Sequence, residues 1–364
     1  MLNYIGVDIG GTKCAVSLGR LEAEEMRIEG KAQFPTQGPP GEVLAACLRA
    51  LDGILAAQAL AYADITGIGI SCGGPLNARR GLILSPPNLP GWDRVEIVRF
   101  FEEATGIPTA LQNDANACAL AEWRYGAGRG LDNMIFLTFG TGLGAGLILD
   151  GRLYSGTNDM AGEVGHIRLE ADGPVGYGKA GSAEGFCSGG GIARLGQMAV
   201  DEALARGERP YLLEAAGTKE GITARLIAEL AFAGDDFCQA IYARCGEELG
   251  RLLSGLIDAL NPQRIVLGGV FMRSADLIRP AMEAVIAREA LPMSAAVCKI
   301  VPAGLGERIG DYAALGVAGL IEPKAADGDP LEDLLARHPE LKAYRAELQA
   351  LRENSPKTQN CCKL

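Results

Sequence analysis

Apolar residues in the first third of the chain alternate between short unbroken runs and longer runs with helical spacing. The short runs are typical of buried strands and cover residues 4–9, 13–18, 65–70 and 109–112. The longer runs are typical of helices and cover residues 42–60, 95–105 and 114–125. Strands and helices that follow one another in this way favour an α/β fold built on sheets.

The clearest helix is predicted at residues 236–260, where apolar residues recur every three or four positions. A strand, a helix, a strand and a last apolar helix are expected after it, at residues 265–267, 276–287, 297–301 and 312–321. Residues 151–191 are rich in glycine and weakly periodic. This stretch is too long for a passive connector, so we expect a functional loop region there.

The character of the chain changes after Pro323. Residues 325–330 have the composition of a linker, and residues 331–351 form a charged, weakly amphipathic helical stretch. Residues 355–364 are expected to be disordered. We expect this extension to pack on the body or on a partner subunit and to carry no chemistry.

Composition and charge exclude several classes of function. The net charge of −11 argues against a nucleic-acid partner, since there is no basic field to bind phosphates. No signal peptide is evident, and glycines interrupt the most apolar stretch, so no membrane association is expected. Ten cysteines without CxxC pairs indicate reduced thiols and a cytoplasmic protein.

A glycine turn follows the first predicted strand, in the run Asp8-Ile9-Gly10-Gly11-Thr12-Lys13. Glycines at such a turn expose backbone N–H groups that can bind phosphate oxygens. A carboxylate directly before the turn can hold Mg²⁺ through water. The run lacks the spacing of a P-loop and the strand-to-helix context of a dinucleotide site.

A second turn of the same kind follows the strand-like residues before Thr138, in the run Thr138-Phe139-Gly140-Thr141-Gly142. Two such hairpins, each opening an α/β segment, suggest two related halves whose turns face each other across a cleft. The simpler alternatives are that hairpins favour glycine turns in general, and that glycine only permits tight packing of the sheet.

Polar residues follow several other strand-like runs. Asn113 and Asp114 lie where a strand ends and a helix begins, so Asp114 could act as a general base or could only cap the helix. Asn88 is a candidate for binding a sugar hydroxyl, and Trp92 for walling the site. Glu163 and His166 add a carboxylate and an imidazole, although a lone histidine is more often structural.

In combination, these motifs resemble the ROK sugar kinases of the actin-like, hexokinase-like ATPase group. The resemblance runs from about residue 4 to residue 321. It is carried by six motifs in family order, namely DIGGTK at 8–13, PNLPGW at 87–92, QNDANACALAE at 112–122, TFGTGLGAG at 138–146, AGEVGHI at 161–167 and VLGGV at 266–270.

The resemblance implies two actin-like, ribonuclease H-like lobes around a central nucleotide and sugar cleft. Residues 1–118 with a C-terminal helix at 310–322 would form the small lobe, residues 119–309 the large lobe, and residues 323–364 the extension. It also implies a cytoplasmic homodimer that uses ATP and Mg²⁺ to phosphorylate a hexose or N-acetylhexosamine. Glucose is the first choice of sugar and N-acetylmannosamine the alternative.

The resemblance also assigns roles to residues. Asp114 would be the general base, and Asp8 would hold Mg²⁺ through water. The sugar would be bound by Gly74, Asn88, Asn113, Glu163, His166 and Glu184. ATP would be bound by Asp8, Gly10, Gly11, Thr12, Lys13, Thr138, Gly140, Thr141, Gly142, Gly268 and Gly269.

One departure from the family pattern concerns zinc. Family members commonly carry three cysteines after the histidine, and these hold a structural zinc together with it. Val175, Tyr177 and Ser182 stand at the three positions here, so no zinc is expected. We expect the loop to be ordered by packing of Val175 and Tyr177 or by sugar binding.

The sequence argues against three other functions. A sugar-responsive repressor needs a DNA-binding module before the first glycine motif, which begins here at residue 8. A sugar-sensing protein without catalysis would not need Asp114 and both glycine turns. An actin-like filament former would not need the pair Glu163 and His166.

Overall fold

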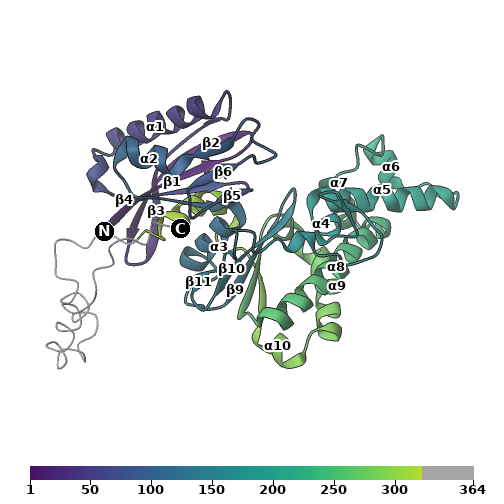
Figure 1. Ribbon diagram of the computed structural model, residues 1–364. Helices are drawn as coiled ribbons and strands as arrows, with labels where there is room; N and C mark the ends of the chain where they lie inside the picture. The colour runs from purple at the N-terminus through teal and green to yellow at the C-terminus, as the bar shows by residue number, and fades with distance from the viewer. Residues whose placement is uncertain (322–364) are drawn as a thin grey trace. The chain divides into compact units, whose positions relative to one another are not determined.

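The computed structural model describes residues 1–321 (Figure 1). The predicted linker, charged helical stretch and tail at 323–364 lie outside the described residues. Two five-stranded sheets form the centre of the described part. None of its helices is both long and apolar enough to cross a membrane.

The first sheet has the strand order β3-β2-β1-β4-β8. Its strands are β1 (Leu2–Ile9), β2 (Lys13–Glu22), β3 (Glu25–Pro35), β4 (Ile65–Cys72) and β8 (Thr109–Asn113). β1 and β2 form the predicted antiparallel hairpin, in which Ile9 lies opposite Cys14. β4 runs parallel to β1, and β8 runs parallel to β4. The carboxyl ends of these three parallel strands therefore meet at one edge.

The second sheet repeats this plan with the order β11-β10-β9-β14-β15. Its strands are β9 (Met134–Phe139), β10 (Leu143–Leu149), β11 (Arg152–Leu153), β14 (Arg264–Leu267) and β15 (Lys299–Pro302). β9 and β10 are an antiparallel hairpin, and β14 and β15 follow in parallel. Two sheets of one order, each starting with a glycine-turned hairpin, agree with the repeat that the sequence suggests.

Small sheets and turns complete the described strands. They are β5 (Leu76–Asn77), β6 (Leu82–Leu84) and β7 (Asp93–Glu96) in one sheet, β12 (Val175–Gly176) and β13 (Lys179–Ala180) in another, and the short 3-10 helices η1 (Tyr62–Asp64), η2 (Val164–His166) and η3 (Gly306–Arg308).

Most of the helices flank the two sheets. They are α1 (Pro40–Ala57), α2 (Ile97–Thr105), α3 (Asp114–Tyr125), α4 (Ala183–Phe186), α5 (Gly189–Ala205), α6 (Tyr211–Ala216), α7 (Ala224–Phe232), α8 (Asp236–Leu260), α9 (Val270–Glu289), α10 (Pro292–Val297) and α11 (Ile309–Ala318). The helix predicted at 236–260 is confirmed in full as α8. The helix predicted at 276–287 is longer, because α9 begins directly after Gly269 and continues through a kink at Ser274.

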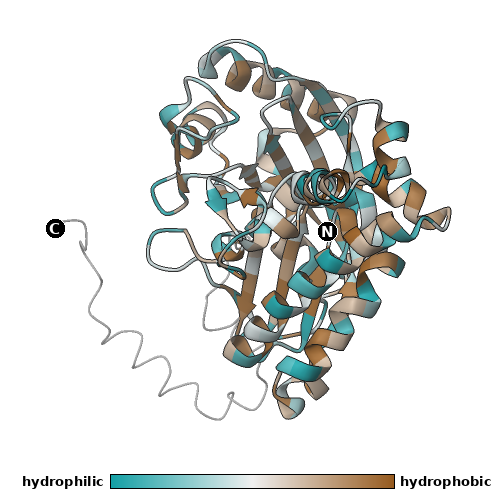
Figure 2. Cartoon of the chain, turned by 90° about the vertical axis from the view of Figure 1, so that its right-hand side faces the viewer, coloured by the Kyte–Doolittle hydropathy of each residue, from teal (hydrophilic) through white to brown (hydrophobic). Residues whose placement is uncertain are grey.

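Apolar side chains form separate cores around the two sheets. One core contains Ile5, Val7, Leu18 and Phe101 beside the first sheet, and another contains Ile135, Leu249 and Phe271 beside the second. In Figure 2 hydrophobic residues gather on the central strands, whereas the helices carry both hydrophilic and hydrophobic residues. The second core is held by the apolar stripe of α8, as its helical spacing predicts.

Helices α3 and α11 lie between the sheets. α11 packs on β1 and β4, where Gly69 lets the backbone of α11 approach so closely that a Cβ would lie 2.1 Å from the Ala314 carbonyl oxygen. α3 contacts α11, β9 and β10, and a Cβ on Gly146 of β10 would lie 2.4 Å from that of Ala119. Glycines on both sheets therefore allow this central pair of helices to fit.

The chain passes from the first sheet to the second after α3 and returns after β15. Backbone N–H groups of both connecting segments donate to the buried carboxylate of Glu122. It accepts hydrogen bonds from the N–H groups of Ala127 (2.7 Å), Gly304 (3.0 Å) and Leu305 (2.9 Å). One side chain thus satisfies backbone donors from both crossings.

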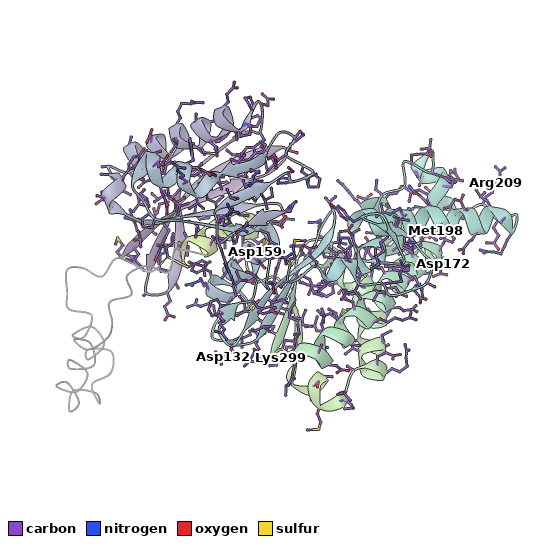
Figure 3. All side chains as sticks on the ribbon, viewed as in Figure 1. Asp132, Asp159, Asp172, Met198, Arg209 and Lys299 are labelled. Carbon is purple, nitrogen blue, oxygen red and sulfur yellow. The ribbon has the colours of Figure 1, made fainter. Side chains whose placement is uncertain are left out.

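Loops also link neighbouring parts of the described chain. The Asp159 carboxylate, labelled in Figure 3, accepts a hydrogen bond of 2.9 Å from the N–H of Ala78. This bond joins the glycine-rich loop after β11 to the turn between β5 and β6. At the other end of the second sheet, Gln263 binds backbone groups of Asp132 and Lys299, which Figure 3 also labels.

Candidate active site

A cavity of about 320 Å³ lies at the carboxyl ends of β1, β4 and β8. Six of the predicted site residues line it: Asp8, Gly10, Gly11, Gly74, Asn88 and Asp114. Ser71, Cys118 and Gly310 also contribute to the wall. Ligands of open α/β sheets bind at this edge, because the loops that follow parallel strands converge there.

Two carboxylates line this cavity, Asp8 at the end of β1 and Asp114 at the start of α3. Burial raises the pKa of Asp8 to about 6, a hydrogen bond with Ser71 opposes the shift, and the negative charge of Asp114 adds to it. The pKa of Asp114 is raised as well, mainly because the surrounding protein removes water from the carboxylate. Its side chain still has access to solvent through the cavity. These two carboxylates are therefore suited to binding a cation or accepting a proton.

Asp114 does not cap its helix through the N-cap position, which was the alternative to a catalytic role. Asn113 is the N-cap, and its Oδ1 accepts a 2.7 Å hydrogen bond from the N–H of Asn116. Asp114 is the first helical residue, and its carboxylate accepts a 2.8 Å bond from the N–H of Ala115. The cap thus uses only one side of the Asn113 amide and leaves Asp114 in the cavity wall.

The first glycine turn contacts the loop that carries Asn88. A Cβ on Gly11 would lie 2.5 Å from the Asn88 carbonyl oxygen, so only glycine fits. Gly10 donates its N–H to the Lys13 carbonyl, and its own carbonyl accepts from the Thr36 hydroxyl at 2.6 Å. The backbone N–H groups of Gly11 and Thr12 have no such partner among residues 1–321, so they are the donors that this turn can offer.

The second glycine turn lies beside two helix starts. Gly140 donates its N–H to the Gly142 carbonyl, and its own carbonyl accepts from the N–H of Gly189 at 2.8 Å. Gly269, at the start of α9, has a φ of +58°, and a Cβ there would lie 1.9 Å from the Phe139 carbonyl oxygen. The predicted adenosine-side turn therefore packs directly on the predicted phosphate turn.

Thr138 and Thr141 are placed differently around this turn. The Thr138 hydroxyl accepts a 3.0 Å hydrogen bond from the N–H of Gly144 and so closes the hairpin. Thr141 is exposed at the tip. On the first hairpin, Thr12 and Lys13 are exposed in the same way.

Glu184 joins the second glycine turn to the predicted sugar-binding loop. Its Oε2 accepts a 3.2 Å hydrogen bond from the N–H of Leu143, at the start of β10. Desolvation raises the pKa of Glu163, with smaller contributions from the charges of Asp114 and Glu184, whereas His166 lowers it. The charges of Asp114, the base candidate, and of Glu184 therefore both act on Glu163.

One expectation was wrong, and one of two alternatives for the loop at 175–177 does not hold. Trp92 does not wall the cavity, because its ring is 1% exposed and packs in the first core, where it fixes the loop that carries Asn88. Val175 and Tyr177 do not order their loop by burial, since they are 46% and 71% exposed. The Tyr177 ring instead contacts the ring of His166.

The side chains at the three family cysteine positions do not fit a zinc ion. Val175 has no donor atom, and Ser182 is buried as the N-cap of α4, where its hydroxyl accepts from the N–H of Gly185. Zinc sites of this type require thiolate or imidazole ligands. Among the residues that the structure describes, no group of three or more His, Cys, Asp or Glu could hold a metal ion.

Sequence reasoning missed three features of the site. Ser71 is the hydrogen-bond partner of Asp8 and could have been found as the last polar residue of a strand. Glu122 ends the QNDANACALAE motif but gave no signal of its long-range contacts. Ser188-Gly189-Gly190-Gly191 starts α5 beside Gly140, and only its glycine content marked it.

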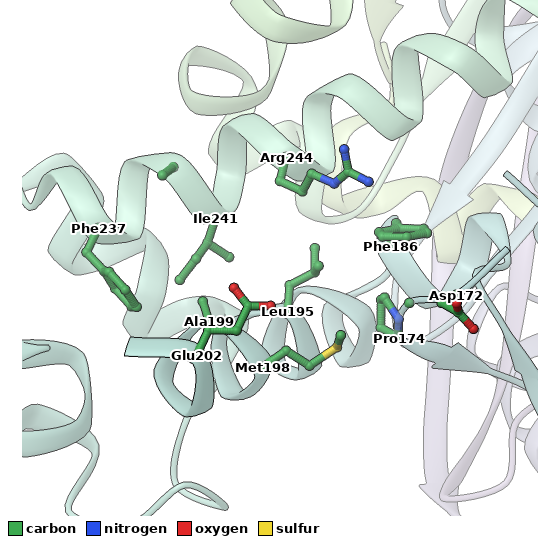
Figure 4. Close-up of a pocket in the computed structure, with 12 residues that line it drawn as sticks. Asp172, Pro174, Phe186, Leu195, Met198, Ala199, Glu202, Phe237, Ile241 and Arg244 are labelled. Atoms are coloured by element: carbon green, nitrogen blue, oxygen red, sulfur yellow. The ribbon is translucent and has the colours of Figure 1, made fainter. Parts of the chain in front are cut away.

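A separate cavity of about 350 Å³ lies between α5 and α8 (Figure 4). Its wall is mostly apolar and includes Leu195, Met198 and Ile241, and the Arg244 guanidinium lies 5.5 Å from the centre of the Phe186 ring. None of the predicted site residues lines this cavity. The two carboxylates and the first glycine turn therefore place the candidate active site at the edge of the first sheet. The second glycine turn is not among the residues that line this cavity, and neither are Glu163, His166 and Glu184.

The duplicated sheets, each opening on a glycine-turned hairpin, define the class of protein as an actin-like ATPase fold. The sequence profile of the ROK family matches residues 4–323. The chain belongs to the ROK family.

Relatives of this chain include named sugar kinases. A glucokinase of Halalkalibacterium halodurans is 34% identical over 283 residues, which are 76% of this chain and 83% of that protein. An N-acetylmannosamine kinase of Shigella flexneri is 34% identical over 272 residues, 74% of this chain and 83% of that protein. A ROK glucokinase from Streptomyces griseus, solved with glucose and AMPPNP, is 29% identical with a TM-score of 0.66, and the match covers 88% of this chain and 99% of that one.

Proposed function

We propose that this protein is an ATP-dependent hexose kinase, with glucose as its substrate and glucose 6-phosphate as its product. The observation that carries the proposal is that Asp114 and the first glycine turn line the same cavity at the carboxyl ends of three parallel strands. Phosphoryl transfer needs a positioned hydroxyl, a base or orienting carboxylate, and groups that neutralise phosphate charge. This cavity brings candidates for each of them together.

The proton acceptor in this proposal is Asp114. The sugar hydroxyl loses its proton to the carboxylate as its oxygen bonds to the γ-phosphorus, and the bond between that phosphorus and the β,γ-bridging oxygen breaks. The raised pKa of Asp114 brings its basicity closer to neutral pH, which suits a general base. The Ala115 N–H holds the carboxylate in place.

Donors from both halves would bind the nucleotide. The N–H groups of Gly11 and Thr12 suit phosphate oxygens, and the turn at Gly140–Gly142 with Gly268 and Gly269 would take the rest of the nucleotide. Asp8 fits Mg²⁺, because this cation is usually held by one or two carboxylates together with substrate phosphates and water. When bound, the cation would neutralise charge on the phosphates.

Sugar hydroxyls would be bound by the predicted residues Gly74, Asn88, Asn113, Glu163, His166 and Glu184. Support comes from Gly74 and Asn88 in the cavity wall and from the Asn113 amide, whose Nδ2 has no partner among residues 1–321. The charges of His166 and Asp114 also act on the pKa of Glu163. N-acetylmannosamine is the alternative substrate, since a relative of equal identity is named as its kinase.

The test is an ATP-consumption assay over a panel of hexoses and N-acetylhexosamines, with the product identified by mass spectrometry and NMR. We expect glucose to be phosphorylated at the 6-hydroxyl with the highest kcat/KM. A higher kcat/KM for N-acetylmannosamine would support the alternative. Sugar binding without ATP consumption by any panel member would instead identify a non-catalytic sugar sensor.

The organisation of the molecule is also part of the proposal. Lobes at 1–118 with the C-terminal helix, and at 119–309, would close on the nucleotide, and the protein would be a cytoplasmic homodimer. Light scattering coupled to size-exclusion chromatography tests the dimer directly. A monomer at micromolar concentration would contradict it.

A further inference from the structure

The hairpin formed by β12 and β13 turns through Tyr177 and Gly178. Both residues have positive φ, at 44° and 76°. Such turns favour asparagine, aspartate or glycine, because a larger side chain strains the left-handed backbone. The Tyr177 side chain is 71% exposed, so burial in the core does not offset this strain. A contact other than burial in the core must therefore offset the strain at Tyr177.

The contacts of this hairpin converge on His166. The rings of Tyr177 and His166 meet edge to face, with centroids 5.1 Å apart and an interplanar angle of 90°. From the next strand, the Lys179 ammonium donates a 2.6 Å hydrogen bond to the His166 carbonyl. One hairpin thus contacts both the imidazole and the backbone of the same residue.

The hairpin is itself anchored to the helix that carries Glu184. The buried Ser182 hydroxyl accepts from the N–H of Gly185 at 3.2 Å and faces the Gly176 carbonyl at 3.4 Å. A Cβ on Gly176 would lie 2.5 Å from the Gly185 nitrogen, so β12 lies directly against the start of α4. His166, the hairpin and α4 therefore form one interlocked unit.

We propose that Tyr177 and Lys179 are positioning residues that hold His166 in the orientation in which it binds a hexose hydroxyl. This inference rests on the proposed function. Edge-to-face contact fixes the plane of the imidazole, and the Lys179 hydrogen bond fixes the turn of η2. Ring contact and hydrogen bonds thus supply the order that a metal ion would supply through thiolates.

Steady-state kinetics with glucose and ATP test the role of the ring. Tyr177→Ala is expected to raise KM for glucose about 2- to 10-fold, the range of an aromatic pair, with kcat within twofold, because binding is lost equally in the ground and transition states. Tyr177→Phe should restore the wild-type KM, since the contact uses the ring. Tyr211→Ala, at an exposed tyrosine of α6, is the matched control and should change nothing.

A double-mutant cycle tests whether the effect passes through His166. Tyr177→Ala should change KM less than twofold in a His166→Ala background. Equal effects of Tyr177→Ala in both backgrounds, or a wild-type KM in Tyr177→Ala itself, would overturn the inference while leaving the proposed function intact. A wild-type chain that phosphorylates no hexose would overturn both.

Proton NMR gives a readout that does not depend on activity. The chain has two histidines, so the His166 ring signal is assigned by its loss in His166→Ala. Tyr177→Ala should shift this signal because the neighbouring aromatic ring is removed, and Tyr177→Phe should leave it near its wild-type position. An unchanged signal in Tyr177→Ala would rule out the ring contact.

Discussion

Single carboxylates in the cavity carry the proposed chemistry, and Asp114 is the proposed base. Asp114 is the first residue of α3, held by the Ala115 N–H and facing the cavity. Asp114→Asn keeps the shape and removes the base, so kcat should fall about 10²- to 10⁴-fold while KM for glucose changes only a few-fold. Fixed-time assays with radiolabelled ATP measure this fall in kcat.

A matched control for this change is available in α8. Asp236 is exposed and is also the first residue of its helix, after an N-cap residue, so Asp236→Asn makes the same chemical change away from the cavity. It should leave kcat unchanged. An Asp114→Asn variant with kcat within tenfold of wild type would exclude Asp114 as the base.

Asp8 gives a prediction about stability and pH. Its pKa of about 6 in the folded chain lies above the usual value of 3.8, so the folded state holds the proton more tightly than the unfolded state. The contribution of Asp8 to the free energy of unfolding therefore falls as pH rises from about 4 to about 6. Asp8→Asn should then stabilise the ligand-free chain by on the order of 2 kcal/mol at pH 8 and by almost nothing at pH 4.

Urea denaturation of both chains at pH 8 and pH 4 measures this difference. Asp236→Asn serves again as the control for the same chemical change at an exposed position. If Asp8→Asn were no more stable than wild type at pH 8, burial would not be the cause of the raised pKa.

Elements differ in how far the sequence reveals them. The apolar stripe of α8 was predictable, because its apolar residues keep helical spacing throughout. Both hairpins were predictable, because each joins two apolar runs through a glycine turn. β3 was missed although Met26, Ile28, Ala32 and Phe34 alternate along it, since charged residues dilute the run. α5 was missed because three glycines at its start lower helix propensity, and Ser188 supplies the cap that compensates.

The candidate site shows the same division. Asp8, Asn88 and Asp114 could be placed in one cavity from sequence, because loops at the carboxyl ends of parallel strands converge. The burial of Trp92 and the contact of Tyr177 with His166 could not, since both depend on how distant loops pack.

The turn between β14 and α9 allows a test of glycine packing at the scale of elements. Gly269→Ala would introduce a Cβ 1.9 Å from the Phe139 carbonyl oxygen at a φ of +58°, so the turn must move. We expect a loss of about 1–3 kcal/mol in unfolding free energy and a higher KM for ATP. Thermal melts and kinetics on the purified variant measure both.

Gly255→Ala is the control, because nothing lies within 4 Å of its Cβ position on α8. It should stabilise the chain by up to about 1 kcal/mol, since alanine is the better helix former. Equal effects of the two substitutions would mean that the turn at Gly269 does not constrain the protein.

At the scale of the molecule, Glu122 ties together the two chain crossings between the sheets. Glu122→Gln would place an amide N–H₂ against backbone N–H groups that now face a carboxylate oxygen. We expect a loss of about 2–4 kcal/mol and a broader urea transition, as the two sheets lose their cooperativity. Glu103→Gln on α2, an exposed ion-pair residue, should have little effect. A sharp transition at the wild-type midpoint in Glu122→Gln would contradict this role.

The meeting of both crossings at Glu122 has a mechanical consequence. We expect the two chain crossings, which one carboxylate ties together, to act as a pivot when one sheet rotates relative to the other. Closure of the proposed lobes on the nucleotide would then be centred on this carboxylate.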